Sequence, residues 1–365
     1  MGPARHLSLV PEGPQDRIVW PVPFADGIDQ LLSLRGRSVA VLASGDPFWF
    51  GAGSVLARHL ERDEWRAFPG LSVFSLAAAR LGWPLESAQC LGLHAAPLER
   101  LRPHLAPGAH IIATLRDGAA VQAVAGYLVS AGFGASVLHV MAALGGPREA
   151  VEQHTAADLP NRFEPAHPVC VAIEVAGDGR VLPRASGLDD DWFDSDGQIT
   201  KRPVRALTLS ALAPCPGERL WDIGGGSGSI AIEWLLSDPA MQAISIEARA
   251  DRAARIVANA ARLGVDRLTV VSGQAPAALD GLDPPDAVFV GGGLSADLLA
   301  VLGALPMGTR IVANAVTLEA EALLTAAQAD LGGTLLRIEL ANAAPLGNKT
   351  GWRAAYPIVQ WAVTL

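Results

Sequence analysis

The chain has 365 residues, of which 50% are hydrophobic and 18% are charged, and its formal net charge is −9. This length corresponds to about two domains, and the high hydrophobic fraction excludes a largely disordered chain. The negative charge argues against a protein that coats nucleic acid or an anionic membrane surface.

The three cysteines, Cys90, Cys170 and Cys215, are far apart and have no CxxC spacing. They indicate a reducing compartment and argue against a structural zinc site. The N-terminal residues lack the apolar core of a signal peptide, and the longest apolar run, residues 298–307, is too short for a membrane-spanning helix. We expect a soluble, cytoplasmic protein with no membrane, nucleic-acid or metal partner; self-association into a homo-oligomer is left open.

Both halves alternate short apolar strands with helical stretches, a pattern typical of α/β domains with parallel sheets. In the first half we expect strands at 38–43, 110–115, 135–140 and 169–175, and helices at 53–62 and 119–131. In the second half we expect strands at 219–223, 243–247, 268–271, 287–290 and 310–314, with a helix at 229–236. The last two predicted strands, 335–340 and 357–363, should pair antiparallel.

Residues 178–198 are rich in acids, with five aspartates between positions 189 and 196 around Trp192 and Phe193. The spaced glycine and closing glutamate of an EF-hand loop are absent. We therefore interpret 178–198 as a solvated linker between a domain at 1–177 and a domain at 199–365. All eight histidines precede residue 168, so the second domain cannot use imidazole for acid–base catalysis or metal binding.

A glycine-rich loop, GGGSG at 224–228, follows the first predicted strand of the second domain and is preceded by Asp222. Its glycines permit a tight turn and a close approach of the backbone to a ligand. The spacing is not the GxGxxG of dinucleotide-binding folds, and the lysine of a P-loop is missing. Glu247 ends the next predicted strand, where a carboxylate can accept both ribose hydroxyls. These features predict a nucleoside ligand without a pyrophosphate, such as S-adenosylmethionine, with Asp222 near its positive methionine end.

Four motifs of the second half, ITKRPVR at 199–205, the glycine loop, GQAP at 273–276 and VGGG at 290–293, resemble the decarboxylating precorrin or cobalt-precorrin C15-methyltransferases of the corrin pathway. The resemblance implies a Rossmann-like, seven-stranded class I methyltransferase fold. The predicted S-adenosylmethionine site comprises Thr200, Asp222, Gly224, Gly225, Gly226, Ser227, Gly228, Glu247, Gly273, Ala275 and Gly291. Candidates for positioning a carboxylate-rich substrate are Arg202, Arg205, Asn314 and Arg353, and no catalytic acid or base is assigned.

In the first half, VLASGDPFWFGAG at 41–53 resembles the GDPxxxGxG loop of the tetrapyrrole methylases, a two-lobed α/β fold that binds S-adenosylmethionine between its lobes. FPGLS at 68–72, AAARLGWP at 77–84, TLRDG at 114–118 and LGGPRE at 144–149 follow in the order of the precorrin C5-methyltransferases. The resemblance implies cofactor contacts at Gly45, Asp46, Gly51 and Thr114, with His94 as a further candidate.

The family opens with a strand and a GxGPG-type loop ahead of a GGxRHL segment, whereas this sequence begins MGPARHL, within that segment. We therefore expect the first strand of this sheet and one wall of its cofactor cleft to be missing.

Two such domains in this order resemble the fused precorrin-6B C5,C15-methyltransferases (decarboxylating). The resemblance implies transfer of two methyl groups from S-adenosylmethionine and loss of the ring C acetate as carbon dioxide, giving precorrin-8x in cobalamin biosynthesis. Electron-rich ring carbons attack the methyl group directly, so such an enzyme mainly positions the two reactants and removes water from them. The alternatives are a cobalt-precorrin substrate, C15 methylation with decarboxylation alone, another small-molecule or RNA methyltransferase, and a non-catalytic nucleoside-binding scaffold.

Overall fold

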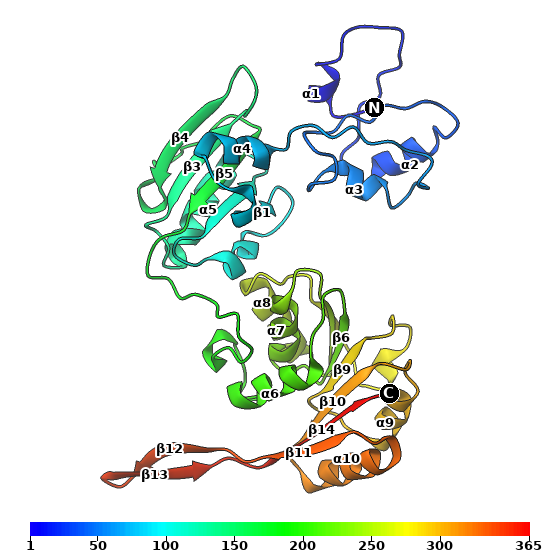
Figure 1. The fold of residues 1–365 in the computed structure, drawn as a ribbon, viewed down its shortest axis with the longest axis vertical. Helices are drawn as coiled ribbons and strands as arrows, with labels where there is room; N and C mark the ends of the chain where they lie inside the picture. Colours follow the sequence, from blue (N-terminus) through cyan, green and yellow to red (C-terminus); the bar gives the residue numbers. More distant parts are fainter. The chain divides into compact units, whose positions relative to one another are not determined.

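The computed structural model describes residues 1–365 and contains two compact units (Figure 1). Unit 1 comprises Met1–Ala96 and Ala106–Gly179, and unit 2 comprises Pro97–Leu105 and Arg180–Leu365. The short segment η2 (Leu98–His104) therefore belongs to unit 2, although it lies within the sequence of unit 1. No helix in the structure has the length and apolar character needed to span a membrane.

The interpretation of residues 178–198 as a solvated linker is wrong. Leu188, Trp192 and Phe193 are buried in the core of unit 2, and the Arg180 guanidinium lies 4.1 Å from the centre of the Trp192 ring. The aspartates of this segment pair with arginines, for example Asp191 with Arg180. The apolar side chains between the acids anchor the segment to the core while most of its other residues stay exposed, and the acidic composition concealed this packing.

Unit 2 is built on a seven-stranded sheet with the order β11-β14-β10-β9-β6-β7-β8. The strands are β6 (Arg219–Ile223), β7 (Gln242–Glu247), β8 (Thr269–Ser272), β9 (Ala287–Val290), β10 (Arg310–Ala315), β11 (Thr334–Ile338) and β14 (Ile358–Thr364). Strands β6 to β10 run parallel, and β14 runs antiparallel between β10 and β11. The predicted class I fold and its antiparallel final pair are confirmed.

Helices cover both faces of this sheet. They are α6 (Arg202–Leu212), α7 (Ser229–Ser237), α8 (Ala250–Arg262), α9 (Ala296–Gly303) and α10 (Leu318–Leu331), with the single turns η4 (Asp190–Trp192) and η5 (Ala277–Leu279). Leu220 and Phe289 join the cluster of α6, α7 and α8, whereas Trp221 and Val290 join that of α9 and α10. Neighbouring residues of one strand face opposite sides, so the two clusters are the two faces of the sheet.

A hairpin that the sequence did not reveal interrupts the final strand pair. Strands β12 (Ala341–Leu346) and β13 (Lys349–Ala354) pair antiparallel and extend from the sheet of unit 2 as an arm (Figure 1). Trp352 on this arm is 81% exposed. Arg353, one of the substrate candidates, lies on β13.

Unit 1 contains a five-stranded sheet with the order β1-β2-β5-β3-β4. Its elements are α4 (Val73–Leu81), η1 (Leu85–Ser87), β1 (Gln89–Gly92), β2 (His110–Thr114), α5 (Ala119–Ser130), β3 (Val137–Ala142), β4 (Ala150–Thr155), η3 (Ala156–Asp158) and β5 (Val169–Glu174). Strand β5 runs antiparallel to both of its neighbours, β2 and β3. The predicted strands at 110–115, 135–140 and 169–175 are confirmed to within two residues.

The first 71 residues of unit 1 contain three short helices, α1 (Ala4–Leu7), α2 (Asp26–Leu32) and α3 (Ala52–Leu56), and an isolated bridge between Gly2 and Val19. The predicted strand at 38–43 is wrong, and the predicted helix at 53–62 ends at Leu56. Gly2 accepts a hydrogen bond from Trp20 N at 2.9 Å, and Met1 accepts one from Leu42 N at 2.9 Å. Only these two residues pair with the flanking segments, which is too short for a strand ladder.

Candidate functional site

A cavity of about 640 Å³ opens at the carboxyl ends of the parallel strands of unit 2. The loops after β6, β7, β8 and β9 line it, together with Asn314 near the end of β10. In open α/β sheets this edge is where ligands bind, and the volume is typical of small-molecule sites.

The glycine loop after β6 forms one wall of this cavity through bare backbone. Gly224 has a positive φ of 74°, and a Cβ there would lie 2.7 Å from the backbone N of Gly292. A Cβ on Gly225 would lie 2.0 Å from the Ser245 hydroxyl. A larger residue at Gly224 would clash with backbone, and one at Gly225 would force the Ser245 or Ile256 side chain to move. The two glycines therefore let the backbone N–H groups at the start of α7 approach the ligand closely.

Glu247, the last residue of β7, joins this loop to the next one. One carboxylate oxygen accepts a hydrogen bond from Gly226 N at 2.9 Å, and the other accepts one from Arg249 N at 2.9 Å. The side chain is 5% exposed and lines the cavity. A carboxylate oxygen has lone pairs beyond the one used here, so Glu247 can accept both hydroxyls of a ribose.

Asp222 on β6 is buried beside the loop. Burial raises the pKa of its carboxyl from 3.8 to about 7, the Ser245 hydroxyl donates a hydrogen bond at 3.3 Å that opposes the rise in pKa, and the charge of Glu247 adds to it. A cationic group in the cavity would favour the ionised form of Asp222. The arrangement fits a nucleoside with a positively charged end.

Most residues predicted for this site come together in the cavity. Those that line it are Thr200, Asp222, Gly224, Gly225, Gly226, Ser227, Glu247, Gly273, Ala275, Gly291 and Asn314. Gly228 instead caps the N-terminus of α7, where a Cβ would lie 2.8 Å from Ile256. The cavity is also lined by three residues that were not predicted, Gln198, Lys201 and Arg252. Of these, Lys201 falls within the ITKRPVR motif.

The three arginines predicted to position the substrate do not line this cavity. Arg205 is the clearest correction, because its side chain is fully buried and bonded to Glu233, Asp190 and the carbonyls of Thr200 and Leu188. Arg202 is exposed and pairs with Asp189, and Arg353 is exposed on the hairpin. A helix face with alternating apolar and basic residues does not reveal which basic group turns inward.

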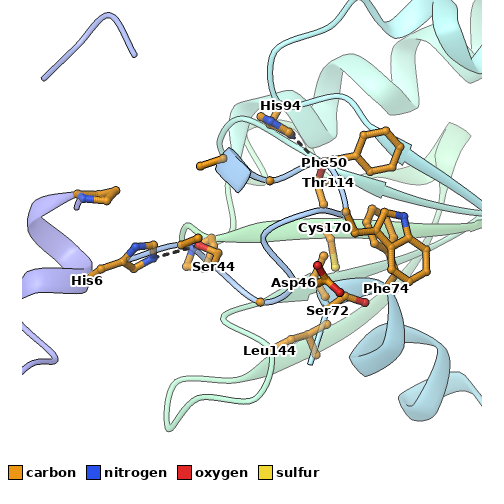
Figure 2. A pocket seen from close by; sticks show the side chains of 18 of the residues that line it. His6, Ser44, Asp46, Phe50, Ser72, Phe74, His94, Thr114, Leu144 and Cys170 are labelled. Atoms are coloured by element: carbon orange, nitrogen blue, oxygen red, sulfur yellow. Dashed lines mark hydrogen bonds between the residues drawn. The ribbon is translucent and has the colours of Figure 1, made fainter. Parts of the chain in front are cut away.

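A second cavity, of about 620 Å³, lies within unit 1, and Figure 2 shows the side chains around it. All four predicted cofactor residues, Gly45, Asp46, Gly51 and Thr114, line it, and so does His94. The sequence therefore predicted a set of residues that the fold collects from the 41–53 loop, the segment after β1 and the end of β2.

The 41–53 loop is held by its own backbone. Asp46 accepts a hydrogen bond from Phe48 N at 2.8 Å, and a Cβ on Gly51 would lie 2.6 Å from the carbonyl oxygen of Pro47. Phe50 has a positive φ of 52°, a conformation that non-glycine residues rarely adopt. The loop thus presents backbone and aromatic rings to the cavity.

Two histidines border the same cavity, and each shares a hydrogen bond with a hydroxyl side chain (Figure 2). His94 Nδ1 lies 3.1 Å from Thr114 Oγ1, and His6 Nε2 lies 3.0 Å from Ser44 Oγ. Burial and the neighbouring Arg5 lower the pKa of His6, so this ring is neutral at pH 7. Cys170 also lines the cavity, and burial raises the pKa of its thiol to about 12, which keeps it protonated. His6, Ser44 and Cys170 were not predicted as site residues, although His6 lies in the MGPARHL segment and Ser44 in the 41–53 motif.

The fold and the sites define a two-unit α/β protein whose second unit is a class I methyltransferase domain. Comparison with known proteins gives the family. Residues 191–365 match the model of the precorrin methyltransferase domain, and residues 27–160 match that of the tetrapyrrole (corrin/porphyrin) methylases.

Curated relatives match almost the whole chain. A precorrin-6Y C(5,15)-methyltransferase (decarboxylating) of Sinorhizobium sp is 53% identical over 350 residues, 94% of this chain and 84% of the relative. The protein of the same name from Mycobacterium tuberculosis (strain CDC 1551 / Oshkosh) is 40% identical, over 100% of this chain and 92% of its own length. The crystal structure of the C-terminal domain of the Rhodobacter capsulatus precorrin-6Y C5,15-methyltransferase has 53% identity and a TM-score of 0.49, covering 50% of this chain and 100% of that domain. The chain belongs to the precorrin-6Y C5,15-methyltransferase (decarboxylating) family.

Proposed function

We propose that the chain methylates a precorrin-6 ring at C5 and C15 and removes the ring C acetate as carbon dioxide, in cobalamin biosynthesis. Its relatives' names describe methylation at C5 and C15 with decarboxylation and give the substrate as precorrin-6Y. The observation that carries the proposal is the cavity of unit 2, whose glycine loop, Asp222 and Glu247 fit S-adenosylmethionine. That cofactor supplies the methyl group.

In unit 2, the residues of the proposed site bind and orient the cofactor. Glu247 holds the ribose, the backbone of Gly224, Gly225 and Gly226 lies against the methionine part, and Asp222 balances its positive charge. Phe289 and Ile358 are apolar parts of the cavity wall. No histidine is present in this unit outside η2, in agreement with a transfer that needs positioning and not a strong base.

In unit 1, we assign the C5 methylation to the cavity beside the 41–53 loop. Gly45, Asp46, Gly51 and Thr114 are the proposed cofactor residues there. The Phe50 and Trp49 rings and the His94–Thr114 pair line the same cavity and face the substrate.

The experiment is to incubate the full chain with labelled S-adenosylmethionine and the precorrin-6 substrate and to measure the product mass. A gain of two methyl groups with loss of carbon dioxide is expected, and an unchanged mass would overturn the proposal. Glu247→Ala should abolish C15 methylation and decarboxylation while leaving one methyl transfer, because Glu247 lies only in the cavity of unit 2.

A narrower function is C15 methylation with decarboxylation alone. The observation that favours it is the absence of a sheet in residues 1–71, so coil and short helices form one wall of the unit 1 cavity. A product that gains one methyl and loses carbon dioxide would identify it. The same assay with a cobalt-containing substrate distinguishes the cobalt-precorrin reaction.

A further inference from the structure

Three polar side chains at one end of the unit 2 cavity bind one another. Thr208 on α6 is fully buried, Gln360 on β14 is 4% exposed, and Asn314 on β10 lines the cavity. Asn314 and Gln360 are direct register partners of the antiparallel β10–β14 pair. Buried polar groups are costly unless they are hydrogen-bonded, and these three satisfy one another.

The hydrogen bonds fix the plane of the Asn314 amide. Its Nδ2 donates to Thr208 Oγ1 at 3.0 Å, and its Oδ1 accepts from Gln360 Nε2 at 3.0 Å. Gln360 Nε2 also donates to Thr208 Oγ1 at 3.1 Å. An amide nitrogen carries two N–H groups, so Asn314 retains one donor for a group in the cavity.

The strand order places Asn314 away from the proposed ribose site. Glu247 ends β7, and β6, β9 and β10 follow across the sheet. Asn314 is therefore three strands from Glu247, roughly 14 Å at about 4.8 Å per strand. Most of the proposed cofactor residues lie at or after the carboxyl ends of β6, β7, β8 and β9, and the end of the cavity at β10 is left for the substrate.

Both cationic side chains of the cavity pair with aspartates. The cationic side chains that line the cavity are Lys201 and Arg252. Lys201 Nζ lies 3.6 Å from Asp190, and Arg252 pairs with Asp196 at 2.9 Å. The substrate carboxylate that enters here meets the neutral amide of Asn314.

We propose that Asn314 binds the substrate carboxylate that is lost as carbon dioxide, and that Thr208 and Gln360 are positioning residues that hold Asn314; the assignment rests on the proposed function. In the step, the bond between the acetate methylene and its carboxylate breaks. The electron pair of that bond passes into the protonated conjugated ring, carbon dioxide leaves, and a proton from water completes the new methyl group.

A neutral donor suits this step better than an arginine. The negative charge leaves the carboxylate for the ring in the transition state, so a cation at the carboxylate would stabilise the starting state more than the transition state. One amide N–H orients the substrate carboxylate and stabilises its starting state less than a cation would.

The test separates decarboxylation from methylation by product mass in single turnovers. Thr208→Val should slow decarboxylation about threefold to tenfold, the loss expected for one hydrogen bond, with unchanged affinity for S-adenosylhomocysteine. Asn314→Asp should slow it about a hundredfold, as for loss of a direct donor. Its activity should recover as the pH falls and the new carboxyl is protonated, a pH profile that a structural defect would not produce.

The matched control is Thr309→Val. Thr309 is also buried, at the opposite end of β10, and its hydroxyl donates to the Pro285 carbonyl at 3.4 Å. Decarboxylation slowed equally by Thr208→Val and Thr309→Val, or an Asn314→Asp enzyme with no recovery at low pH, would overturn the assignment.

A binding measurement decides the assignment even where the wild-type chain leaves the substrate mass unchanged and the proposed function fails. The probe is uroporphyrin, a stable tetrapyrrole that carries acetate and propionate groups. The ¹⁵N side-chain resonance of Asn314, assigned by its loss in Asn314→Asp, should shift when uroporphyrin is added. An unshifted resonance at every uroporphyrin concentration rejects Asn314 as the carboxylate site.

Discussion

Arg205 and Glu233 form an ion pair inside unit 2 in which the two side chains are 0% and 4% exposed. Glu233 also accepts hydrogen bonds from Gly187 N and Leu188 N, and Arg205 donates to the carbonyls of Leu188 and Thr200. The pair thus ties residues 187–188 of the acidic segment to α6 and α7 and fixes Thr200 at the cavity. A residue expected to bind substrate instead holds the wall of the site.

Removal of Arg205 should therefore lower the free energy of unfolding. Arg205→Leu leaves the Glu233 charge buried without its partner, which costs about 3–5 kcal/mol. Arg202→Leu, which removes an exposed pair with Asp189 on the same helix, should cost less than about 1 kcal/mol. Urea denaturation of both variants measures the difference, and equal losses would contradict the role of the buried pair.

Binding of S-adenosylmethionine to unit 2 should weaken as the pH falls below 7. Burial raises the pKa of Asp222 to about 7, and only the ionised carboxylate attracts the cationic ligand. The ionised fraction falls about fivefold between pH 7 and pH 6, and the affinity should follow it. Calorimetric titration of the site that Glu247→Ala removes measures this, and Asp222→Asn should make the affinity independent of pH in this range.

The same raised pKa has the opposite effect on folding. The pKa of Asp222 is 3.8 when the group is exposed and about 7 in the fold, so between about pH 4 and pH 7 the folded state binds the additional proton. The contribution of Asp222 to stability is therefore lost as the pH rises through this range. Asp222→Asn should remove this pH dependence from the unfolding free energy of unit 2.

Gly225→Ala should abolish cofactor binding in unit 2. The added Cβ would lie 2.0 Å from the Ser245 hydroxyl and 2.9 Å from Ile256 Cδ1, so either these buried side chains or the loop must shift. Gly303→Ala in α9, whose Cβ would meet only Leu331 at 3.6 Å, is the matched control and should leave binding unchanged. Equilibrium dialysis with labelled S-adenosylmethionine compares the two, and full binding by Gly225→Ala would show that the loop does not form the site.

Leu101→Ala in η2 should destabilise unit 2, although residue 101 lies within the sequence of unit 1. Leu101 is fully buried, η2 packs against α8, and Arg100 pairs with Asp266 at 2.8 Å. Loss of a buried leucine costs about 2–5 kcal/mol. Hydrogen exchange should report faster opening in α8, whereas Leu93→Ala should act on the sheet of unit 1. Faster exchange in unit 1 alone for Leu101→Ala would contradict the assignment of η2.

The parallel strands of unit 2 could be predicted because each is a short apolar run bounded by turn residues, and a local pattern of this kind is enough. The predicted strand at 38–43 has the same pattern, yet its backbone hydrogen bonds go only to Met1. A strand needs a neighbour as well as a propensity. The hairpin at 341–354 shows the reverse case, in which two strands pair without the apolar pattern. Its residues are mostly exposed and do not alternate between apolar and polar, so no pattern in the sequence indicated it.

The sequence by itself determined the two α/β domains, the positions of the unit 2 strands along the chain and the two glycine loops, because these depend on residues near one another in the chain. Only the tertiary structure decided that Arg205 turns inward, that residues 97–105 belong to unit 2, and that Thr208, Asn314 and Gln360 meet. Asn314 lies 106 residues from Thr208 and 46 from Gln360. Contacts over such separations arise from the packing of α6 on β10 and β14, and no local period in the chain encodes them.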